Sequence, residues 1–172
     1  ALAGQKRARI VVRLKPENHR WCLTVEDNGP VLSDADFRHL QDLISKKQLQ
    51  DVVRLAGFRH PVLPYVATSD FGILASTVQE GCPLSPQEYM SQGRPVVATD
   101  NGGQREYIVS GINGVLVPPC DSKKLAEAMA QMINDPEKRG EMGRKAKEDF
   151  FDHMDYEYFY TQIKQLYGAY LE

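Results

Sequence analysis

Short apolar runs alternate with longer stretches of helical period along this chain. The runs are rich in β-branched and aliphatic residues, which the strands of a buried sheet favour. They lie at residues 21–26, 52–55, 71–75, 95–99 and 114–117. Strands that alternate with helices build a parallel sheet, because each helix carries the chain back across one face of the sheet. The pattern therefore predicts an α/β fold with helices on both faces.

Three helix starts are indicated by residues that cap helices. Ser and Asp side chains accept hydrogen bonds from the first free amides, and Pro suits the first helical position. The caps are Ser33-Asp34, Asp121 and Asp135-Pro136. They predict helices over residues 33–47 and 122–134 and a further helix from residue 136. The first carries Phe37, Leu40 and Ile44 at the spacings of one apolar face, as expected of a crossover helix.

Both ends of the chain also have helical patterns. Residues 2–12 favour a helix that ends before Pro16, with a strand over residues 10–14 as the alternative. Near the C-terminus, apolar residues recur at near-helical spacing, at Tyr156, Phe159, Ile163, Leu166 and Tyr170. Such a stripe is typical of a packing surface rather than of a cofactor site. In a longer protein, it can pack on a part that is absent here.

Charge and composition narrow the range of ligands. The 172 residues carry 21 Lys and Arg against 23 Asp and Glu, which gives a formal net charge of −2. This balance leaves no extended cationic surface, so nucleic acid is a poor candidate. Apolar residues make up 42% of the chain, enough for a packed core. Because the sequence shows neither a secretory leader nor an apolar run of about 20 residues, we expect one cytoplasmic domain over residues 1–172 without a transmembrane segment.

The cysteines and histidines do not suggest a metal site or a disulfide framework. Cys22, Cys82 and Cys120 lie tens of residues apart, and the four histidines are equally scattered. Thiolate zinc sites need close pairs of cysteines, which this sequence lacks. We therefore expect reduced thiols and no bound metal.

Candidate chemistry is concentrated in residues 77–90, which follow a predicted strand and lead into a predicted helix. In an open parallel sheet, ligands bind where the carboxyl ends of the strands meet loops and helix N-termini. Gly81 lets a ligand approach the backbone closely. A helix that starts near Ser85 offers free amides and a positive pole to an anion such as a diphosphate. Glu80 and Glu88 flank that pole.

Each of these two acids has a structural alternative. Residues 85–88, Ser-Pro-Gln-Glu, spell a capping box in which Glu88 only caps the helix. Glu80, on the loop before the helix, is either a solvated charge or an acceptor of hydrogen bonds from ligand hydroxyl groups. The residue pattern alone leaves both alternatives open.

A longer ordered series of motifs surrounds the two acids. It consists of residues 69–76, 80–84, 88–90 and 93–99, Gly102-Gly103, Glu106, Gly111, Asn113-Gly114 and residues 117–119. The series resembles the C-terminal, donor-binding half of retaining glycosyltransferases of glycosyltransferase family 4, which have the GT-B fold. Glu80 and Glu88 match the Glu-x7-Glu pair of that family. The resemblance runs from about Trp21 to the end, and it implies a Rossmann-like parallel sheet that is one half of a two-domain enzyme.

The resemblance implies that the ligand is a nucleotide-diphosphate sugar. Glu88 would accept hydrogen bonds from the ribose hydroxyls. Glu80, as the catalytic residue, would contact hydroxyls of the donor sugar near the reacting carbon. The sugar and the diphosphate would face the backbone of four residues, Gly81, Cys82, Pro83 and Leu84.

Further positions follow from the same resemblance. Gly57, Phe58 and Arg59 would line the pocket for the base, although a Phe at a strand end is more often a core residue. Gly102-Gly103 would begin a second helix or form a tight turn. Asp70 and Glu106 are interpreted as structural. Gly111 and the Asn113-Gly114 pair are interpreted as a helix stop and a turn with left-handed backbone angles.

The implied reaction moves a hexosyl group to an acceptor hydroxyl. The bond from the anomeric carbon to the diphosphate breaks, and the hydroxyl attacks from the same face, so the configuration is retained. No metal is needed where cationic side chains and helix amides stabilise the leaving diphosphate. The family usually places an Arg and a Lys for this purpose after the first strand of this half. Residues 13–18 echo that motif only faintly.

The expected enzyme needs a second domain. A two-domain transferase has roughly twice this length, so we expect the N-terminal acceptor domain to be missing, and with it any attachment to a cytosolic membrane surface. The isolated chain is then expected to bind donor weakly and to transfer little or nothing, because half of the cleft is absent. A second hypothesis is a non-catalytic nucleotide-sugar-binding subunit that works with a separate acceptor-binding chain. The sequence does not reveal the base, the sugar or the acceptor.

Overall fold

The computed structural model describes residues 9–14, 21–26, 33–55 and 61–168, with side chains described from residue 33 onward. Six strands of the described chain form one sheet in the order β3-β1-β2-β4-β5-β6. They are β1 (Arg9–Leu14), β2 (Trp21–Glu26), β3 (Val53–Arg54), β4 (Phe71–Leu74), β5 (Val96–Thr99) and β6 (Gly114–Val117). The neighbours from β2 to β6 run parallel, whereas β1 runs antiparallel to β2 and β3. The predicted α/β, Rossmann-like sheet is confirmed, with antiparallel pairing added at one edge.

Strand β1 corrects the expectation for the N-terminal segment. The helix favoured over residues 2–12 is wrong where the structure describes it, because residues 9–14 form a strand, as the alternative proposed. Val12 lies opposite Leu23 of β2 on one side and Val53 of β3 on the other. The β-branched run of Ile10, Val11 and Val12 suits a strand with partners on both sides. Residues 1–8 lie outside the described residues.

Helices connect and cover these strands. The helices of the described chain are α1 (Asp34–Lys46), α2 (Leu63–Ala67), α3 (Leu84–Ser91), α4 (Ser122–Asn134), α5 (Pro136–His153), α6 (Tyr156–Gly168) and the 3₁₀ helix η1 (Gly103–Glu106). The predicted caps are confirmed, since the side chains of Ser33, Asp121 and Asp135 each accept a hydrogen bond from an amide in the first turn. Helix α1 joins β2 to β3, which point the same way, so it is a crossover helix.

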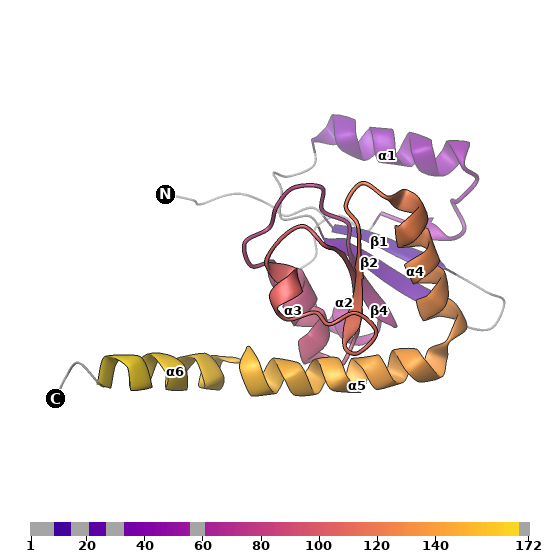
Figure 1. Cartoon of the computed structure of the whole chain (residues 1–172). Coiled ribbons are helices and arrows are strands. Elements are labelled where there is room, and N and C mark those ends of the chain that lie inside the picture. Colours follow the sequence, from indigo (N-terminus) through magenta and orange to yellow (C-terminus); the bar gives the residue numbers. More distant parts are fainter. Residues whose placement is uncertain (1–8, 15–20, 27–32, 56–60, 169–172) are drawn as a thin grey trace.

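Alternate residues of β4 and β5 enter two apolar cores, one on each face of the sheet. Helix α4 covers one face, and α2 and α3 cover the other (Figure 1). The first core contains Phe71, Ile73, Val97, Val117, Ala128, Met132 and Met142. The second contains Val66, Leu74, Tyr89, Met90, Val96, Ala98, Ile108 and Ala146. Helix α5 contributes to both cores, since Met142 belongs to the first and Ala146 to the second.

Two glycines allow elements to approach closely. A Cβ atom on Gly143 of α5 would lie 2.3 Å from the carbonyl oxygen of Gly93, in the turn after α3. A Cβ atom on Gly114 would lie 2.7 Å from the carbonyl oxygen of Val96. Gly114 therefore serves the contact between β6 and β5 rather than the left-handed turn predicted for it. Gly111 does have the predicted left-handed backbone, with φ +84°.

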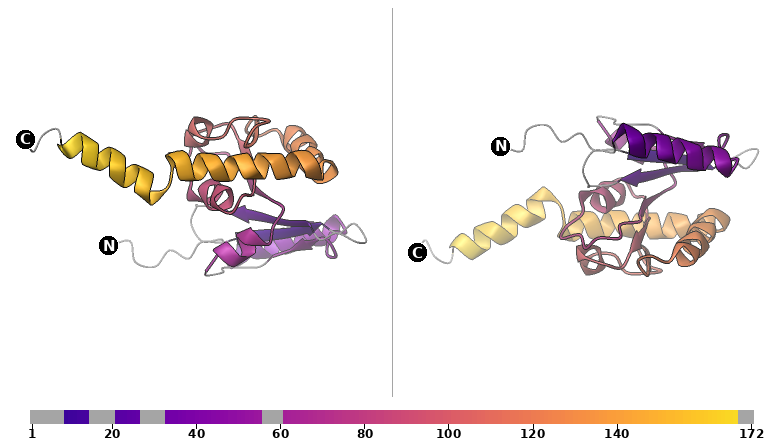
Figure 2. Two further views of the ribbon diagram at one scale, coloured as in Figure 1. Left: turned by 90° about the horizontal axis from the view of Figure 1, so that it is seen from below. Right: turned by 90° about the horizontal axis from the view of Figure 1, so that it is seen from above.

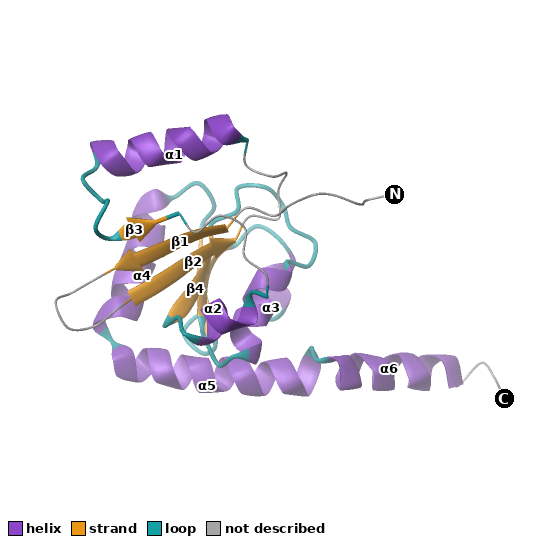
Figure 3. Ribbon diagram, turned by 180° about the vertical axis from the view of Figure 1, so that it is seen from behind, coloured by secondary structure: helices purple, strands orange, loops and turns teal. Residues whose placement is uncertain are grey.

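Helix α6 projects away from the rest of the domain, as Figures 2 and 3 show. The helix itself was predicted, but none of its residues between 156 and 168 is buried. Tyr156 is 72% exposed and Phe159 is 62% exposed, so their apolar stripe is not packed on this domain. In the described part of the chain, no helix combines the length and the apolar character that a membrane crossing requires.

Candidate functional site

The carboxyl ends of β4 and β5 lie side by side and each leads into a loop. The two strands are parallel neighbours, with Leu74 opposite Ala98. The loop after β4 carries Glu80 and Gly81 toward α3, and the loop after β5 leads through Gly102 into η1. Loops at this edge of a parallel sheet are where such folds bind ligands, which is the arrangement that the sequence predicted.

A pocket of about 390 Å³ lies between these two loops. It is lined by Gln79, Glu80, Gly81, Asn101, Gly102, Gly103, Arg105 and Glu106. The carboxylate of Glu80 is half-buried and accepts a hydrogen bond from the Ser76 hydroxyl at 3.0 Å. Space beside Gly81 is open, since a Cβ atom there would meet nothing within 4 Å. The pocket therefore offers an oriented carboxylate next to accessible backbone.

Two glycines, Gly102 and Gly103, allow the loop after β5 to lie directly against the loop after β4. The amide of Gly103 donates to the carbonyl oxygen of Glu80 at 2.8 Å. A Cβ atom on Gly102 would lie 2.2 Å from that oxygen, and one on Gly103 would lie 1.8 Å from the carbonyl oxygen of Gly81. Any larger residue at either position would displace the loop that carries Glu80. Gly102 precedes the short helix η1, so the expected second helix start is a single 3₁₀ turn.

The start of α3 corrects the capping-box interpretation of Glu88. The helix begins at Leu84 with Pro83 as its N-cap, and no side chain caps it. Ser85 therefore lies inside the first turn, where its side chain is buried, instead of at the cap. Glu88 follows one turn later and is half-buried. The structural explanation of Glu88 as a capping residue is wrong.

Tyr107 connects the second loop to the start of α3. Its hydroxyl donates to the carbonyl oxygen of Pro83 at 3.2 Å. Burial raises the pKa of the Tyr107 hydroxyl, and the nearby thiol of Cys82 raises it further. The amide of Gln87 also donates to the Cys82 sulfur at 3.1 Å. Tyr107 therefore ties Pro83 to the second loop, and Gln87 ties Cys82 to α3.

The structure brings together part of the predicted site. Glu80 and Gly81 line the pocket, whereas Glu88 is not among its lining residues. At the N-terminus of α3, Cys82 and Leu84 are exposed and Pro83 is buried. Gly57, Phe58 and Arg59 lie outside the described residues.

Two acids of the family-like series have different surroundings. Asp70 pairs with Arg139 at 3.2 Å, which ties the start of β4 to α5 and supports its structural interpretation. Glu106 is exposed and lines the pocket. Among the residues described, no group of three or more His, Cys, Asp or Glu side chains is placed to hold a metal ion. The expectation that no metal is needed stays a prediction.

Sequence reasoning missed Asn101 as a residue of the site. Asn101 lines the pocket and makes hydrogen bonds to the loop that carries Glu80. Its signal in the sequence is its position directly after strand β5, at the edge where ligands bind. That signal does not distinguish Asn101 from Asp100, its neighbour.

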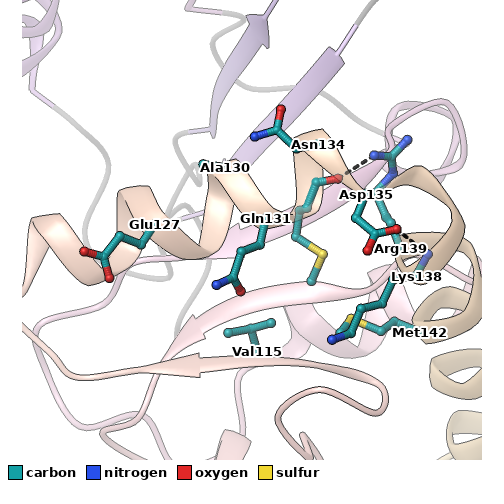
Figure 4. Close-up of a pocket in the computed structure, with 10 residues that line it drawn as sticks. Val115, Glu127, Ala130, Gln131, Asn134, Asp135, Lys138, Arg139 and Met142 are labelled. Carbon is teal, nitrogen blue, oxygen red and sulfur yellow. Dashed lines mark hydrogen bonds between the residues drawn. The ribbon is translucent and has the colours of Figure 1, made fainter.

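A larger pocket of about 540 Å³ lies between β6, α4 and α5, with Arg139, the partner of Asp70, on its wall (Figure 4). Val115 and Met142 form apolar parts of its lining, and Gln131 and Lys138 lie at its polar side. It contains none of the predicted site residues. Arg139 on the pocket wall pairs with Asp70, which directly precedes β4. The pocket therefore lies toward the amino end of the sheet, whereas Glu80 lies beyond its carboxyl end. We therefore place the candidate site at the smaller pocket.

A family comparison agrees with this geometry. The sequence model of the family described as Glycosyl transferases group 1 matches residues 9–149. The chain belongs to this glycosyltransferase family. The match includes both loops of the pocket and the start of α3, so the predicted resemblance to the C-terminal half of GT-B glycosyltransferases is confirmed.

Individual relatives of this glycosyltransferase domain cover most of it. Alpha-D-kanosaminyltransferase of Streptomyces kanamyceticus is 31% identical over 71% of this chain and 31% of its own length. HepE of Anabaena, solved in complex with UDP, is 27% identical with a TM-score of 0.75, over 78% of this chain and 37% of HepE. The C-terminal domain of LpcC from Francisella tularensis, a glycosyl transferase group 1 family protein, is 25% identical with a TM-score of 0.66, over 72% of this chain and 65% of that one. The chain spans about a third of the length of the first two relatives.

Proposed function

We propose that this chain is the donor-binding half of a retaining glycosyltransferase that uses a nucleotide-diphosphate sugar. The observation that carries the proposal is the Glu80 carboxylate, oriented by Ser76 at the rim of a pocket beside the start of α3. Family membership supports the reaction class. The UDP bound to HepE, a relative of the same fold, supports a nucleoside diphosphate as part of the ligand.

The parts of the donor are assigned along the segment from Glu80 to Glu88. The hydroxyls of the sugar donate to Glu80, whose carboxylate accepts hydrogen bonds at the pocket. The backbone from Gly81 to Leu84 faces the diphosphate, and the uncapped first turn of α3 supplies free amides and a positive dipole. Glu88 accepts hydrogen bonds from the ribose. Residues 57–59 are proposed for the base, on the resemblance alone.

The reaction then needs the sugar to be held while its bond to the diphosphate breaks. Glu80 orients the sugar near its anomeric carbon, and an acceptor hydroxyl forms the new bond on the face that the diphosphate leaves. The electron pair of the broken bond stays on the diphosphate, which takes up the proton of the acceptor hydroxyl, and the α3 N-terminus stabilises the charge that develops there. No metal is part of this proposal. The domain that binds the acceptor lies outside this chain, so the isolated chain is expected to transfer little or nothing.

A second candidate function is a non-catalytic nucleotide-sugar-binding subunit that works with a separate acceptor-binding chain. The observation that favours it is the exposed apolar stripe of α6, where Tyr156, Phe159 and Leu166 are each more than half exposed. Such a stripe suits contact with another protein. Donor binding at Glu80 and Glu88 is common to both candidates.

Titration calorimetry with UDP-, GDP- and ADP-sugars tests the donor site. We expect the wild-type chain to bind one of these classes, and Glu88→Gln and Glu80→Gln to bind it about tenfold more weakly or worse. A hydrogen bond to a charged group contributes about 1.5–3 kcal/mol, and about 1.4 kcal/mol corresponds to a factor of ten. The matched control is Glu141→Gln on the exposed side of α5, which should bind like wild type. If Glu88→Gln binds every nucleotide as well as wild type does, the ribose assignment is wrong.

A further inference from the structure

The loop between β4 and α3 has no regular secondary structure to fix its conformation. Ser76 to Pro83 form neither helix nor strand. Val78 at the middle of the loop is 65% exposed, so apolar burial does not hold it. A loop that must present Glu80 in one orientation therefore depends on hydrogen bonds to a rigid neighbour.

Asn101 supplies these hydrogen bonds from the neighbouring loop. Its amide nitrogen donates to the carbonyl oxygen of Ser76 at 2.8 Å and to that of Val78 at 2.8 Å. Its amide oxygen accepts from the amide of Gln104 at 2.7 Å. Both protons of the amide nitrogen and the amide oxygen are thus engaged within the protein.

The anchors behind Asn101 are rigid. Gln104 is fully buried and Thr99 is 4% exposed. The Thr99 hydroxyl donates to the carbonyl oxygen of Ser76 at 2.7 Å. The carbonyl oxygen of Thr99 accepts from the Gln104 side-chain amide and from the backbone amide of Asn101, the latter at 3.1 Å. Asn101 therefore fixes the exposed loop relative to the end of β5.

Ser76 connects this network to the Glu80 carboxylate. The backbone of Ser76 is held by Asn101 and Thr99, and its hydroxyl donates to Glu80 Oε1 at 3.0 Å. If Asn101 released the carbonyl oxygens of Ser76 and Val78, Thr99 alone would hold the Ser76 backbone, and the Ser76 hydroxyl would be less fixed relative to Glu80. The start of α3 would keep its separate contact from Tyr107 to Pro83.

We propose that Asn101 is a positioning residue that sets the orientation of the Glu80 carboxylate toward the sugar of the donor. This inference rests on the proposed function and adds a residue that acts through Glu80 without using its own polar atoms on the ligand. Its effect is confined to the sugar end, because the contacts of α3 do not pass through Asn101.

The variant Asn101→Asp tests this role with almost no change in shape. A carboxylate at this position cannot donate to the carbonyl oxygens of Ser76 and Val78, and it repels them. Calorimetry would compare the nucleotide sugar that wild type binds best, among UDP-glucose, GDP-mannose and ADP-glucose, with the corresponding nucleoside diphosphate. We expect Asn101→Asp to lower the affinity for the nucleotide sugar at least about fivefold and that for the nucleoside diphosphate less than about twofold.

A double-mutant cycle supplies a measurement that a merely structural role would not move. In the Glu80→Gln background, Asn101→Asp is expected not to change the ratio of the affinities for the nucleotide sugar and the nucleoside diphosphate, because Asn101 acts through the Glu80 carboxylate. The matched control is Asn113→Asp, since Asn113 is another fully bonded amide, donating to Tyr107 and Asp149 away from the loop. It should lower the unfolding temperature without changing the ratio of the two affinities.

The outcomes separate this inference from the proposed function. A wild-type chain that binds no nucleotide sugar overturns the proposed function and this inference with it. Sugar-dependent binding that is lost in Glu80→Gln but kept in Asn101→Asp overturns this inference alone, as does an equal loss for nucleotide sugar and nucleoside diphosphate. Asn101→Ala, which removes both donors without adding charge, repeats the test. Failure of both Asn101 variants to fold while Asn113→Asp folds would also overturn it, because Asn101 would then support the whole domain.

Discussion

At the scale of single residues, Tyr107 shows how one hydroxyl group links stability to the geometry of the site. The hydroxyl donates to Pro83, the N-cap of α3, and burial raises the pKa of Tyr107 above its ordinary value of 10.0. The folded chain therefore holds this proton more tightly than the unfolded chain does. Stability from this group is complete below about pH 10 and is lost as the pH rises above that value, where the unfolded chain ionises first.

Tyr107→Phe is expected to lower the free energy of unfolding by about 1 kcal/mol at pH 8, the usual contribution of one hydrogen bond. The difference between wild type and variant should shrink as the pH rises from 9 to 11, because only wild type loses stability through this hydroxyl. Urea unfolding at several pH values measures both effects. Tyr156→Phe, on a ring that is 72% exposed, is the control and should change neither. A pH dependence equal in wild type and Tyr107→Phe would contradict the assignment.

Individual residues of the site differ in how well the sequence predicted them. The place of Glu80 and Gly81 at the pocket could be predicted because they follow an apolar strand and precede a helix, and their family-like spacing reinforced the prediction. Their roles toward a donor stay predictions. Asn101 could not be, since its importance comes from carbonyl groups 23 and 25 residues away in the chain. Hydrogen bonds between loops of distant sequence leave no periodic pattern. The same reason hid Tyr107, whose partner Pro83 lies 24 residues earlier.

At the scale of elements, two glycines of α5 have opposite expected roles. A Cβ atom on Gly143 would lie 2.3 Å from the carbonyl oxygen of Gly93 and 3.3 Å from Pro95, whereas one on Gly140 would meet nothing within 4 Å. Glycine in a helix interior costs about 0.5–1 kcal/mol relative to alanine. The cost has a packing reason at position 143 and none at position 140.

Gly140→Ala is expected to raise the free energy of unfolding by about 0.5–1 kcal/mol. Gly143→Ala is expected to lower it by about 1–3 kcal/mol, because α5 must move away from the turn after α3. Denaturant unfolding of the two variants measures the contrast on one helix with the same change of residue. Stabilisation by both substitutions would show that α5 does not pack on Gly93 as described.

Elements with local signals were predicted closely, and those with tertiary causes were not. The caps Asp121 and Asp135 predicted the first residues of α4 and α5 correctly, because a cap is a local interaction. Residues 10–14 were ambiguous, since pairing with β2 and β3 decides their strand conformation. The capping box at Ser85 was plausible locally, yet Tyr107 holds Pro83 as the N-cap and the helix starts earlier.

At the scale of the whole molecule, α6 is separable from the rest. Both apolar cores are complete without it, and none of its residues from 156 to 168 is buried. Removing residues 156–172 is therefore expected to shift the unfolding temperature by less than about 4 °C, which corresponds to about 1 kcal/mol for a chain of this size. Calorimetric unfolding measures the shift. Removing residues 150–172 is the contrasting control, since it also takes away Phe150 and Met154, which pack on the second core, and should cause a much larger decrease.

The position of α5 has a mechanical consequence for the domain. Met142 enters one core and Ala146 the other, so lifting this helix would expose apolar surface on both sides of the sheet at once. Such a double penalty makes the two layers move as a rigid body. Adjustment to an incoming molecule is then confined to side chains on the loops after β4 and β5, because the links of Asn101 and Gly103 also hold the backbone of these loops.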